Sequence, residues 1–408
     1  MGFCKSFLTK LFAIFVVFLA IAFLPGLPPE MEFTPYTPSE PLDFTGPLAP
    51  NDKLNGAERI FEGKIQNPEC LAVANGTVYT SSRGGDIVKL VGDKLVPVAN
   101  IGHKCEGYWE EKKCGRTLGM TFDTKGFLYV VDAYYGIYKI NVNTGKVGHL
   151  IKIDQPISGK TVKIANSVAV GKDGTVYWTA SSCDTSFDDA VLTMLGDATG
   201  RLFKFDPASK TNTLLLDKVH FANGLALSQN EDFVVVAETV RTRLVRYWLK
   251  GPKQGSSEIF FDSLPGIPDN IKVNKEGIFD VTVPLQRTKT YPLLSDLIAP
   301  YPLIRRFLAR VFYLMEVPFT LIQDNYPNFY SGIITHLIGS FDPLLPLFPK
   351  EVLVLQFDQN GKLLSSLRST DDKVTLISDI ILAGNYYYLG SPFNNYLGRV
   401  KIDKIKAD

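Results

Sequence analysis

The chain has 408 residues, which leaves open whether it forms one large domain or several average ones. Its formal net charge is +1, with 43 basic and 42 acidic residues, and this balance gives no reason to expect nucleic acid as a partner. The 33 glycines, 25 prolines and an aromatic content of 12% favour many short strands joined by tight turns over a helical bundle.

An unbroken apolar run, LFAIFVVFLAIAFL, lies near the amino terminus. Lys5 and Lys10 precede it and a Pro-Gly-Leu-Pro-Pro breaker follows it. Together with its apolar neighbours the run has about the 20 residues that cross a bilayer, and its positive flank is expected to stay in the cytosol. We therefore predict a cytosolic tail (1–10), a transmembrane signal anchor (11–27) and a single-pass type II topology.

A cleaved signal peptide is the alternative, because Ala20-Ile21-Ala22 supplies small residues at a suitable spacing. Both interpretations export the rest of the chain into the secretory pathway, to the lumen or the cell surface. The segment 28–57, rich in Pro, Ser, Thr and acidic residues, is expected to be an extended stalk. The triplet Asn75-Gly76-Thr77 is a glycosylation sequon, although Asn-Gly is also a common turn dipeptide.

A repeated unit begins at about Pro68. Each copy contains an apolar strand, a Gly-containing turn, an aromatic strand and a third strand, with apolar and polar residues alternating at period two. Six copies of roughly 45 to 55 residues indicate an all-β, six-bladed β-propeller spanning 58–408. An open sandwich is the alternative, since its turn signals would look similar.

One stretch, about 284–350, is longer than any blade loop and is predicted to be an insertion in the fifth blade. Between Ile304 and Phe312 the apolar residues fall at helical spacing with three arginines among them, which predicts a basic amphipathic helix. This helix would pack on the propeller rim or serve as a lid or a membrane-surface contact.

Two of the five cysteines, Cys105 and Cys114, lie close together in a polar loop, where a disulfide would close a short lobe. Two independent thiols are the alternative. An exported domain favours the disulfide. Cys70 and Cys183 are either buried thiols or a second pair.

Polar side chains recur where the inner strands of the predicted blades begin. In a propeller these positions meet at one mouth of the central channel. Two carboxylates and three amide carbonyls are hard oxygen ligands that suit Ca²⁺ rather than zinc or copper. Each residue alone could equally be a turn residue. The predicted calcium ligands are Glu69, Asn166, Asn223, Asp269 and Asn270.

The segments ANSVAV, FANGLALSQNEDFVVVAET and PDNIKV resemble the calcium-binding stretches of paraoxonases and related lactonases. That resemblance implies a propeller whose channel ion is held at the five positions just named. The segment ending CGRTLGM is similar to strictosidine synthase-like proteins, a resemblance that implies a disulfide between its cysteines.

The resemblance also has departures. Leu118 and Val283 stand where paraoxonases have the two histidines of a proposed catalytic dyad, and His220 near Asn223 is interpreted as structural. No glutamate follows Glu351, so the lyase chemistry of true strictosidine synthases is not expected.

Two functions therefore stay open. One is calcium-dependent hydrolysis of a small-molecule ester or lactone, like that of an arylesterase, with the channel Ca²⁺ polarising the carbonyl. The other is a binding or receptor-like propeller with structural calcium. No catalytic residue is predicted.

Overall fold

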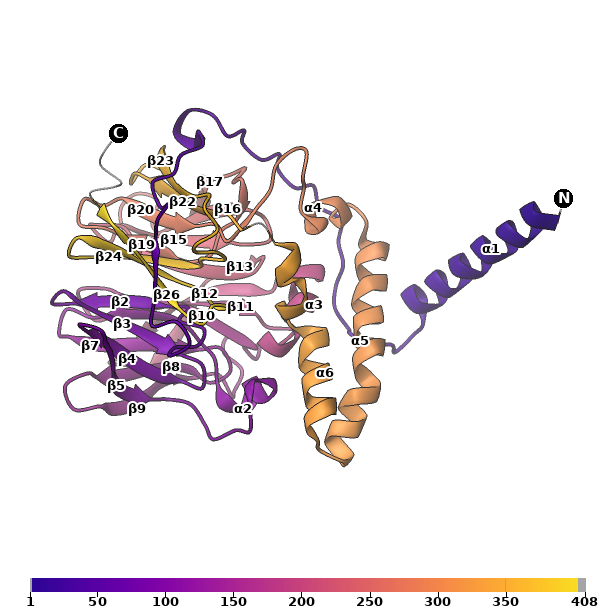
Figure 1. Cartoon of the computed structure of the whole chain (residues 1–408), viewed down its shortest axis with the longest axis horizontal. Coiled ribbons are helices and arrows are strands. Elements are labelled where there is room, and N and C mark those ends of the chain that lie inside the picture. Colours follow the sequence, from indigo (N-terminus) through magenta and orange to yellow (C-terminus); the bar gives the residue numbers. More distant parts are fainter. Residues whose placement is uncertain (1, 349, 403–408) are drawn as a thin grey trace. The chain divides into compact units, whose positions relative to one another are not determined.

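The computed structural model of the protein describes residues 2–348 and 350–402, which form two units. The propeller unit comprises residues 39–187, 198–291 and those described from 344 onward. The helical unit comprises residues 2–38, 188–197 and 292–343. Figure 1 labels most strands of the propeller unit and, in the helical unit, the helices α1 and α3 to α6.

The described part of the propeller unit contains six antiparallel sheets of four strands and one sheet of two. The first sheet holds β2 (Leu71–Ala74), β3 (Thr77–Ser82), β4 (Asp86–Val91) and β5 (Lys94–Asn100). The second holds β6 (Thr117–Phe122), β7 (Phe127–Asp132), β8 (Gly136–Asn141) and β9 (Lys146–Lys152). The third holds β10 (Ile164–Val170), β11 (Val176–Ser182), β12 (Gly200–Asp206) and β13 (Thr211–Val219).

The fourth sheet holds β14 (Ala222–Leu227), β15 (Phe233–Glu238), β16 (Arg243–Trp248) and β17 (Ser257–Phe261). The fifth holds β19 (Ile271–Val273), β20 (Phe279–Thr282), β22 (Val352–Phe357) and β23 (Leu363–Ser369). The sixth joins β24 (Asp379–Ala383), β25 (Tyr386–Gly390) and β26 (Leu397–Lys401) to β1 (Glu58–Ile60). The two-stranded sheet pairs β18 (Gly266–Ile267) with β21 (Leu285–Gln286).

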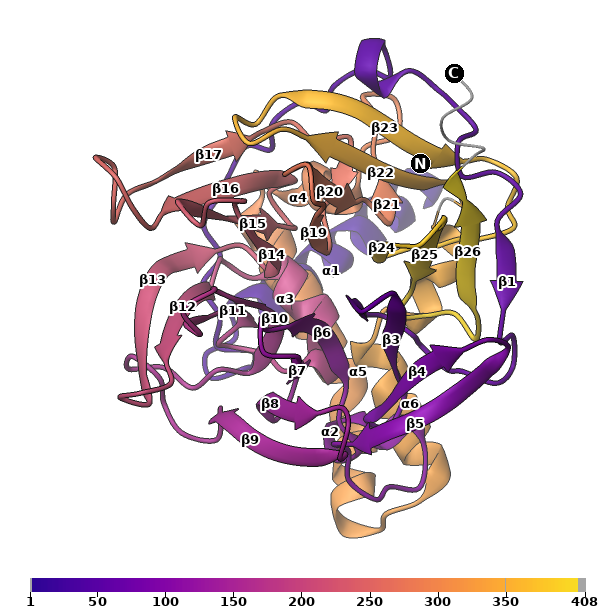
Figure 2. The ribbon, with the colours of Figure 1, turned by 90° about the vertical axis from the view of Figure 1, so that its left-hand side faces the viewer.

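The first strands of the six sheets form a closed ring. Each contacts the next in the order β2, β6, β10, β14, β19, β24, and β24 contacts β2 again. Figure 2 shows the sheets radiating from this centre. Strand β1 pairs with β26, so a strand from the beginning of the domain completes the sheet built from its end.

The predicted all-β propeller is therefore confirmed, and the open sandwich is wrong. Its core lies between successive sheets. The second strand of a sheet is covered on both faces by its neighbours, and for this reason β11 and β15 are buried along their whole length. The cluster between the fourth and fifth sheets includes Val235, Phe279 and Leu355.

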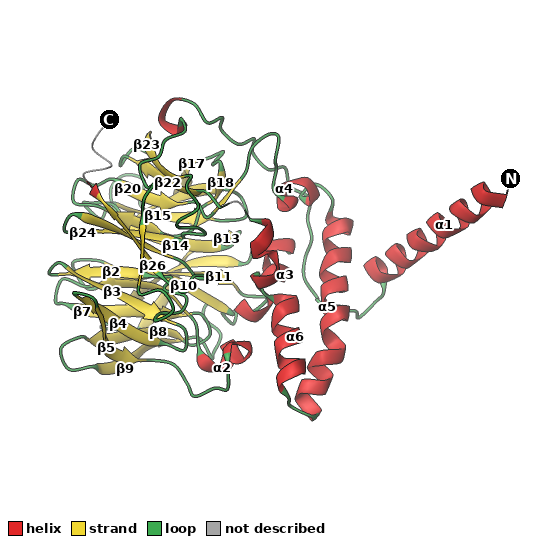
Figure 3. Cartoon of the chain, viewed as in Figure 1, coloured by secondary structure: helices red, strands yellow, loops and turns green. Residues whose placement is uncertain are grey.

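The helices of the insertion separate β20 and β22, two strands that are neighbours in the fifth sheet, as the sequence predicts. They are α4 (Leu294–Ile298), α5 (Pro302–Asn325) and α6 (Phe329–Gly339), followed by the 3-10 turn η4 (Asp342–Leu347) (Figure 3). Pro302 stands at the first turn of α5, where it has no helical hydrogen bond to lose. Helix α6 begins after Asn328, whose Oδ1 accepts hydrogen bonds from the backbone N–H groups of Tyr330 and Ser331.

The rest of the helical unit is α1 (Gly2–Phe23) and α3 (Ala190–Leu195). Its core contains Phe33, Leu192 and Ala309, among others. Arg305 of α5 is buried, and its Nη1 donates to the carbonyl oxygens of Leu195 at 3.0 Å and Gly196 at 3.4 Å. One arginine of the predicted basic helix is therefore a buried cross-link within the unit.

The segment 28–57, expected to be a stalk, has no helix or strand except the 3-10 turn η1 (Gly46–Leu48). Its second half lies along the propeller. Leu48 and Leu54 are buried there, and the backbone N–H of Leu54 donates to Arg368 O at 2.8 Å. This part of the segment is extended but packed.

Candidate metal centre at the channel mouth

β-Bulges interrupt three of the inner strands near their first residues. They lie between Thr117 and Gly119 in β6, between Ala165 and Val168 in β10, and between Ala222 and Leu225 in β14. A bulge bends a strand and re-aims its side chains. Two of the predicted ligands, Asn166 and Asn223, lie within these bulges.

Asn223 and Asp269 come together between the fourth and fifth sheets. The Asn223 side chain donates a hydrogen bond to the Asp269 carboxylate, and the backbone N–H of Gly224 donates to Asp269 O at 3.2 Å. Gly224 allows this approach, because a Cβ there would lie 2.5 Å from that oxygen. Burial and the Asp379 carboxylate raise the pKa of Asp269 to about 7, although the hydrogen bond from Asn223 lowers it.

Glu69 joins this pair from the loop before β2. Burial raises the pKa of Glu69 well above its usual range; Arg116 lowers it, while Asp269 and Glu111 raise it further. Glu69 and Asp269 therefore lie close enough for their charges to repel. Glu69 Oε2 is buried, and its charged neighbour is the guanidinium of Arg116, whose Nε lies 3.5 Å away.

The two remaining predicted ligands are buried at the inner strands of the third and fifth sheets. Asn166 is in the β10 bulge, and Asn270 directly precedes β19. The backbone of Asn270 is fixed on both sides: its N–H donates to Ser378 O at 3.2 Å and its carbonyl accepts from the N–H of Thr282 at 3.2 Å. Contacts and electrostatic interactions therefore link Glu69, Asn223 and Asp269. Asn166 and Asn270 are buried at inner strands, and no hydrogen bond links their side chains to these three residues in the part of the chain described.

Lys272 and Asp379 were missed from the sequence and form a second charged group at the inner strands. Lys272 Nζ lies 3.2 Å from Asp379 Oδ2 and donates to Leu71 O at 2.8 Å. The same carboxylate oxygen accepts from the backbone N–H of Leu71 at 2.8 Å. Asp379 is fully buried, and burial raises its pKa although Lys272 lowers it. This contact joins β2, β19 and β24.

Arg116, also missed, is buried between Glu69 and Glu111. Its Nη1 lies 3.6 Å from Glu111 Oε1, and its Nη2 donates to Pro392 O at 2.8 Å. Nearby Asp132 is fully buried, and burial raises its pKa to about 7 despite hydrogen bonds from the backbone N–H groups of Tyr134 and Tyr135. The mouth therefore combines carboxylates with one guanidinium.

A divalent cation fits the group of Glu69, Asn223 and Asp269. Two carboxylates that repel one another would both be stabilised in the ionised form by a cation. Carboxylate and amide oxygens are donors that calcium prefers. Within residues 2–348 and 350–402, no cluster of three His, Cys, Asp or Glu suited to a metal ion occurs, so this site depends on its amides. Arg116 weakens the attraction for a cation.

Cys105 and Cys114 are joined by a disulfide, with their Cα atoms 5.3 Å apart. Cys114 ends the short helix α2 (Glu111–Cys114), which follows the 3-10 turn η2 (Tyr108–Glu110), so the disulfide closes the loop that carries Glu111 and ends two residues before Arg116. Cys70 and Cys183 are free and buried, which excludes the second pair. Burial raises the pKa of these thiols to about 12 and about 11.

The positions where paraoxonases have histidines are apolar and buried here: Leu118 is 1% exposed and Val283 is fully buried. His220 is buried, and its backbone N–H donates to Glu238 Oε1 at 2.9 Å. Asn75 is exposed in the turn between β2 and β3, where it and Gly76 both have positive φ, as an Asn-Gly hairpin turn requires. Glycosylation of Asn75 stays a prediction.

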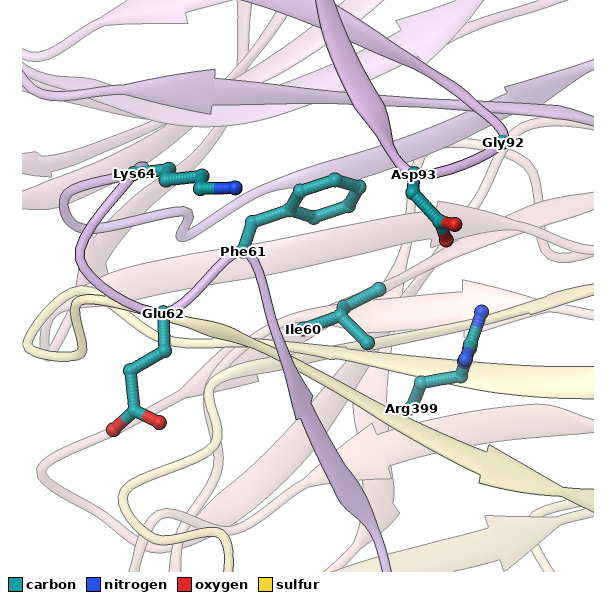
Figure 4. A pocket seen from close by; sticks show the side chains of 7 residues that line it. All are labelled: Ile60, Phe61, Glu62, Lys64, Gly92, Asp93 and Arg399. Atoms are coloured by element: carbon teal, nitrogen blue, oxygen red, sulfur yellow. The ribbon is translucent and has the colours of Figure 1, made fainter.

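A separate depression of about 240 Å³ lies beside β1, and it includes none of the predicted ligands. Figure 4 shows its lining, in which Asp93 and Arg399 approach Ile60 and Phe61. Arg399 is already paired with Glu58 at 2.5 Å. We assign no function to this depression.

Comparison with known proteins agrees with this architecture. Residues 166–252 match the family model described as strictosidine synthase, and residues 46–90 match that described as strictosidine synthase-like, N-terminal. The whole chain is 41% identical over 415 residues to adipocyte plasma membrane-associated protein Hemomucin of Drosophila melanogaster, of which the match covers 71%. The chain belongs to the adipocyte plasma membrane-associated protein family.

Solved structures share the fold of this family member at low identity. One is a gluconolactonase from Xanthomonas campestris, with a TM-score of 0.53, 14% identity and coverage of 93% of this chain and 99% of that one. Another is the calcium-binding protein regucalcin from Agrobacterium tumefaciens, with a TM-score of 0.50, 10% identity and coverage of 84% and 92%. At these identities the likeness establishes the propeller fold.

The family name describes proteins associated with a membrane, and α1 of this member suits that association. Its window Ser6–Phe23 has a mean hydropathy of 2.4 and is long and apolar enough to cross a bilayer. Only 6% of the window is buried within the protein, so its apolar side chains are available to lipid.

Proposed function

We propose that this family member is a membrane-anchored, calcium-binding propeller that hydrolyses small esters or lactones slowly at its channel mouth. The observation that carries the proposal is the group of Glu69, Asn223 and Asp269, in which the buried carboxylate of Glu69 and the half-buried carboxylate of Asp269 repel one another and meet an amide. The names of two propellers with the same fold, a gluconolactonase and a calcium-binding protein, support it.

The proposed ligands of the ion are these three residues with Asn166 and Asn270. When bound, calcium would polarise the carbonyl group of an ester or lactone and stabilise the negative charge that develops on its oxygen. In the hydrolysis the oxygen of a water molecule joins the acyl carbon, the ester C–O bond breaks, and the departing alkoxide oxygen gains a proton.

The protein's own contribution to proton transfer is expected to be weak. Glu69 and Asp269 are the carboxylates of the proposed site, but a carboxylate that binds a cation is a poor base. The positions of Leu118 and Val283 supply no imidazole. Slow turnover is the consequence, and it favours a simple substrate with a good leaving group.

The same two apolar residues favour a second candidate, a binding propeller with structural calcium. An ion held by residues from four sheets would stabilise the closed ring without any reaction, because a ligand that binds only the folded state stabilises that state. The two candidates share the calcium site and differ in turnover.

We further propose that α1 anchors the protein in a type II orientation. Lys5 and Lys10 lie on the amino-terminal side of the apolar run, the flank that stays in the cytosol. The propeller is then lumenal or extracellular, an environment in which the Cys105–Cys114 disulfide persists.

Hydrolysis of phenyl acetate and of an aliphatic lactone by the full chain in detergent micelles tests the proposal. Calcium should support the rate of hydrolysis, and chelation of calcium should abolish hydrolysis. The Asn223→Ala variant should remain folded but lose hydrolysis. Asn143→Ala, which removes an exposed loop amide, is the matched control and should keep its calcium-dependent hydrolysis. Calcium-dependent stability without turnover would favour the binding function.

A further inference from the structure

Helix α5 has one continuous apolar face, and most of the residues on this face are exposed to solvent. Phe307, Leu314 and Leu321 follow one another at intervals of seven residues, two helical turns, and therefore share a face. Leu314 is 41% exposed and Leu321 is 57% exposed. The other apolar residues on this face are Leu303, Ile304, Val311, Met315, Pro318 and Ile322.

The opposite face of α5 is the one that packs inside the helical unit. Arg305 and Ala309 are buried there, the latter fully. The core of the helical unit therefore contacts the side of α5 opposite to the apolar face, and the apolar face is not part of that core. An apolar surface of this length on a folded protein calls for a partner.

The apolar face adjoins the transmembrane anchor. Phe307 contacts Phe18 of α1, with ring centroids 4.8 Å apart. Arg310 Nη1 donates to Ile21 O and Ala22 O, both at 2.9 Å, and to Leu24 O at 3.1 Å. Arg310 therefore binds the carbonyl oxygens at the carboxyl end of α1, where a cation is favoured by the helix dipole.

The contact between Phe307 and Phe18 places the beginning of α5 at a defined distance from the carboxyl end of α1. Phe18 lies five residues before Phe23, the last residue of α1, which is about 7 Å along the helix axis. Interfacial helices bury their apolar faces about 5–10 Å into the boundary between headgroups and acyl chains. If α1 crosses the bilayer and ends at its surface, Phe307 lies within this range of depths.

Aromatic side chains at the turn between α5 and α6 extend the same surface. Tyr326 is 79% exposed, Tyr330 is 74% exposed and Phe329 is 49% exposed. Tyrosine is enriched where membrane meets water, because its ring is apolar and its hydroxyl is polar.

We propose that the apolar face of α5, with the aromatic turn before α6, lies in the interfacial layer of the same bilayer that α1 crosses. Lipid is the occupant because the face is continuous with the anchor through Phe307 and Arg310. The inference rests on the anchor proposed above, and the experiment separates the two.

Site-specific fluorescence on the full chain in phosphatidylcholine vesicles tests the inference. In a Cys4→Ser background, Leu321→Cys receives an environment-sensitive fluorophore; Cys70 and Cys183 are buried and Cys105 is disulfide-bonded to Cys114, so none of these is labelled. Asn143→Cys, at an exposed loop position of the propeller unit, is the matched control. Val17→Cys reports on the anchor itself.

Lipids brominated near the top of the acyl chain should quench the label at position 321, and that label should emit at shorter wavelength than the one at position 143. Quenching at position 17 with none at 321 would overturn the lipid contact and leave the anchor intact. Energy transfer between 321 labels on different chains, without lipid quenching, would assign the face to a second copy. Quenching at 321 with none at 17 would retain the lipid contact and overturn the anchor, and quenching at neither position would overturn both.

Discussion

At the scale of single residues, Asp280 in β20 offers a pH-dependent test of packing away from the channel mouth. It is 5% exposed, and its Oδ1 accepts a hydrogen bond from Gln356 Nε2 at 2.7 Å. Burial raises the pKa of Asp280 to about 6, although Gln356 lowers it. The folded protein therefore binds a proton more tightly than the unfolded chain, in which an aspartate titrates near about 3.9.

Because the folded pKa is the higher one, stability is greatest below about pH 4 and falls as the pH rises through about 6. Asp280→Asn keeps the shape and the acceptor for Gln356 but removes the charge. We expect this variant to be more stable than the parent at pH 7 by about 2–3 kcal/mol, with the difference vanishing near pH 4. Thermal unfolding at both pH values measures it, and equal melting temperatures at pH 7 would contradict the buried, ionised carboxylate.

The ion pair of Lys272 and Asp379 is the second test at this scale. Lys272→Met leaves a fully buried carboxylate without its cation, which should cost about 3–5 kcal/mol of stability. Adding Asp379→Asn in the same chain removes the uncompensated charge and should recover most of that loss. A double variant as unstable as the sum of the two single variants would show that the two side chains do not interact.

The sequence predicts part of this chemistry and misses part for identifiable reasons. The segments containing Asn223 and Asp269 each begin an inner strand, and the fold brings these two residues into contact. Asp379 begins an inner strand in the same way, so the same pattern predicts it. Lys272 is different: a lysine in an alternating strand is expected to face solvent, and only the closed ring shows it reaching the carbonyl of Leu71.

At the scale of elements, the disulfide between Cys105 and Cys114 closes the loop that carries Glu111 and ends two residues before Arg116. The chain-entropy model assigns a loop of this size about 2–3 kcal/mol of stabilisation. Replacing both cysteines by serine should lower the melting temperature, and reduction of the parent should lower it equally. Reductant should not affect the double variant, which serves as the control. No difference between parent and variant would mean that the loop is held by its other contacts.

Strands and helices differ in how far the sequence predicts them. Period-two alternation and Asn-Gly or Asp-Gly turns mark the hairpins well, because each hairpin is a local structure. The insertion helix was predicted only from Ile304 to Phe312, whereas α5 extends from Pro302 to Asn325. The apolar positions continue at helical spacing beyond Phe312, but Pro318 interrupts the pattern and conceals the second half.

At the scale of the whole molecule, the proposed calcium site links sheets that are distant along the chain. Glu69 precedes the first sheet, Asn166 lies in the third, Asn223 in the fourth, and Asp269 precedes the inner strand of the fifth. An ion bound by all of them would resist opening of the ring. Calcium at one hundred times its dissociation constant would add about 2.7 kcal/mol of stability.

The most direct test is a calcium titration of the full chain in detergent micelles, followed by calorimetry and by melting temperature. The parent and the Asn143→Ala control should bind one ion and melt at higher temperature as calcium rises, while Asn223→Ala should do neither. A parent chain that neither binds calcium at about 10⁻³ M nor changes its melting temperature would contradict the assignment of these residues to a metal centre.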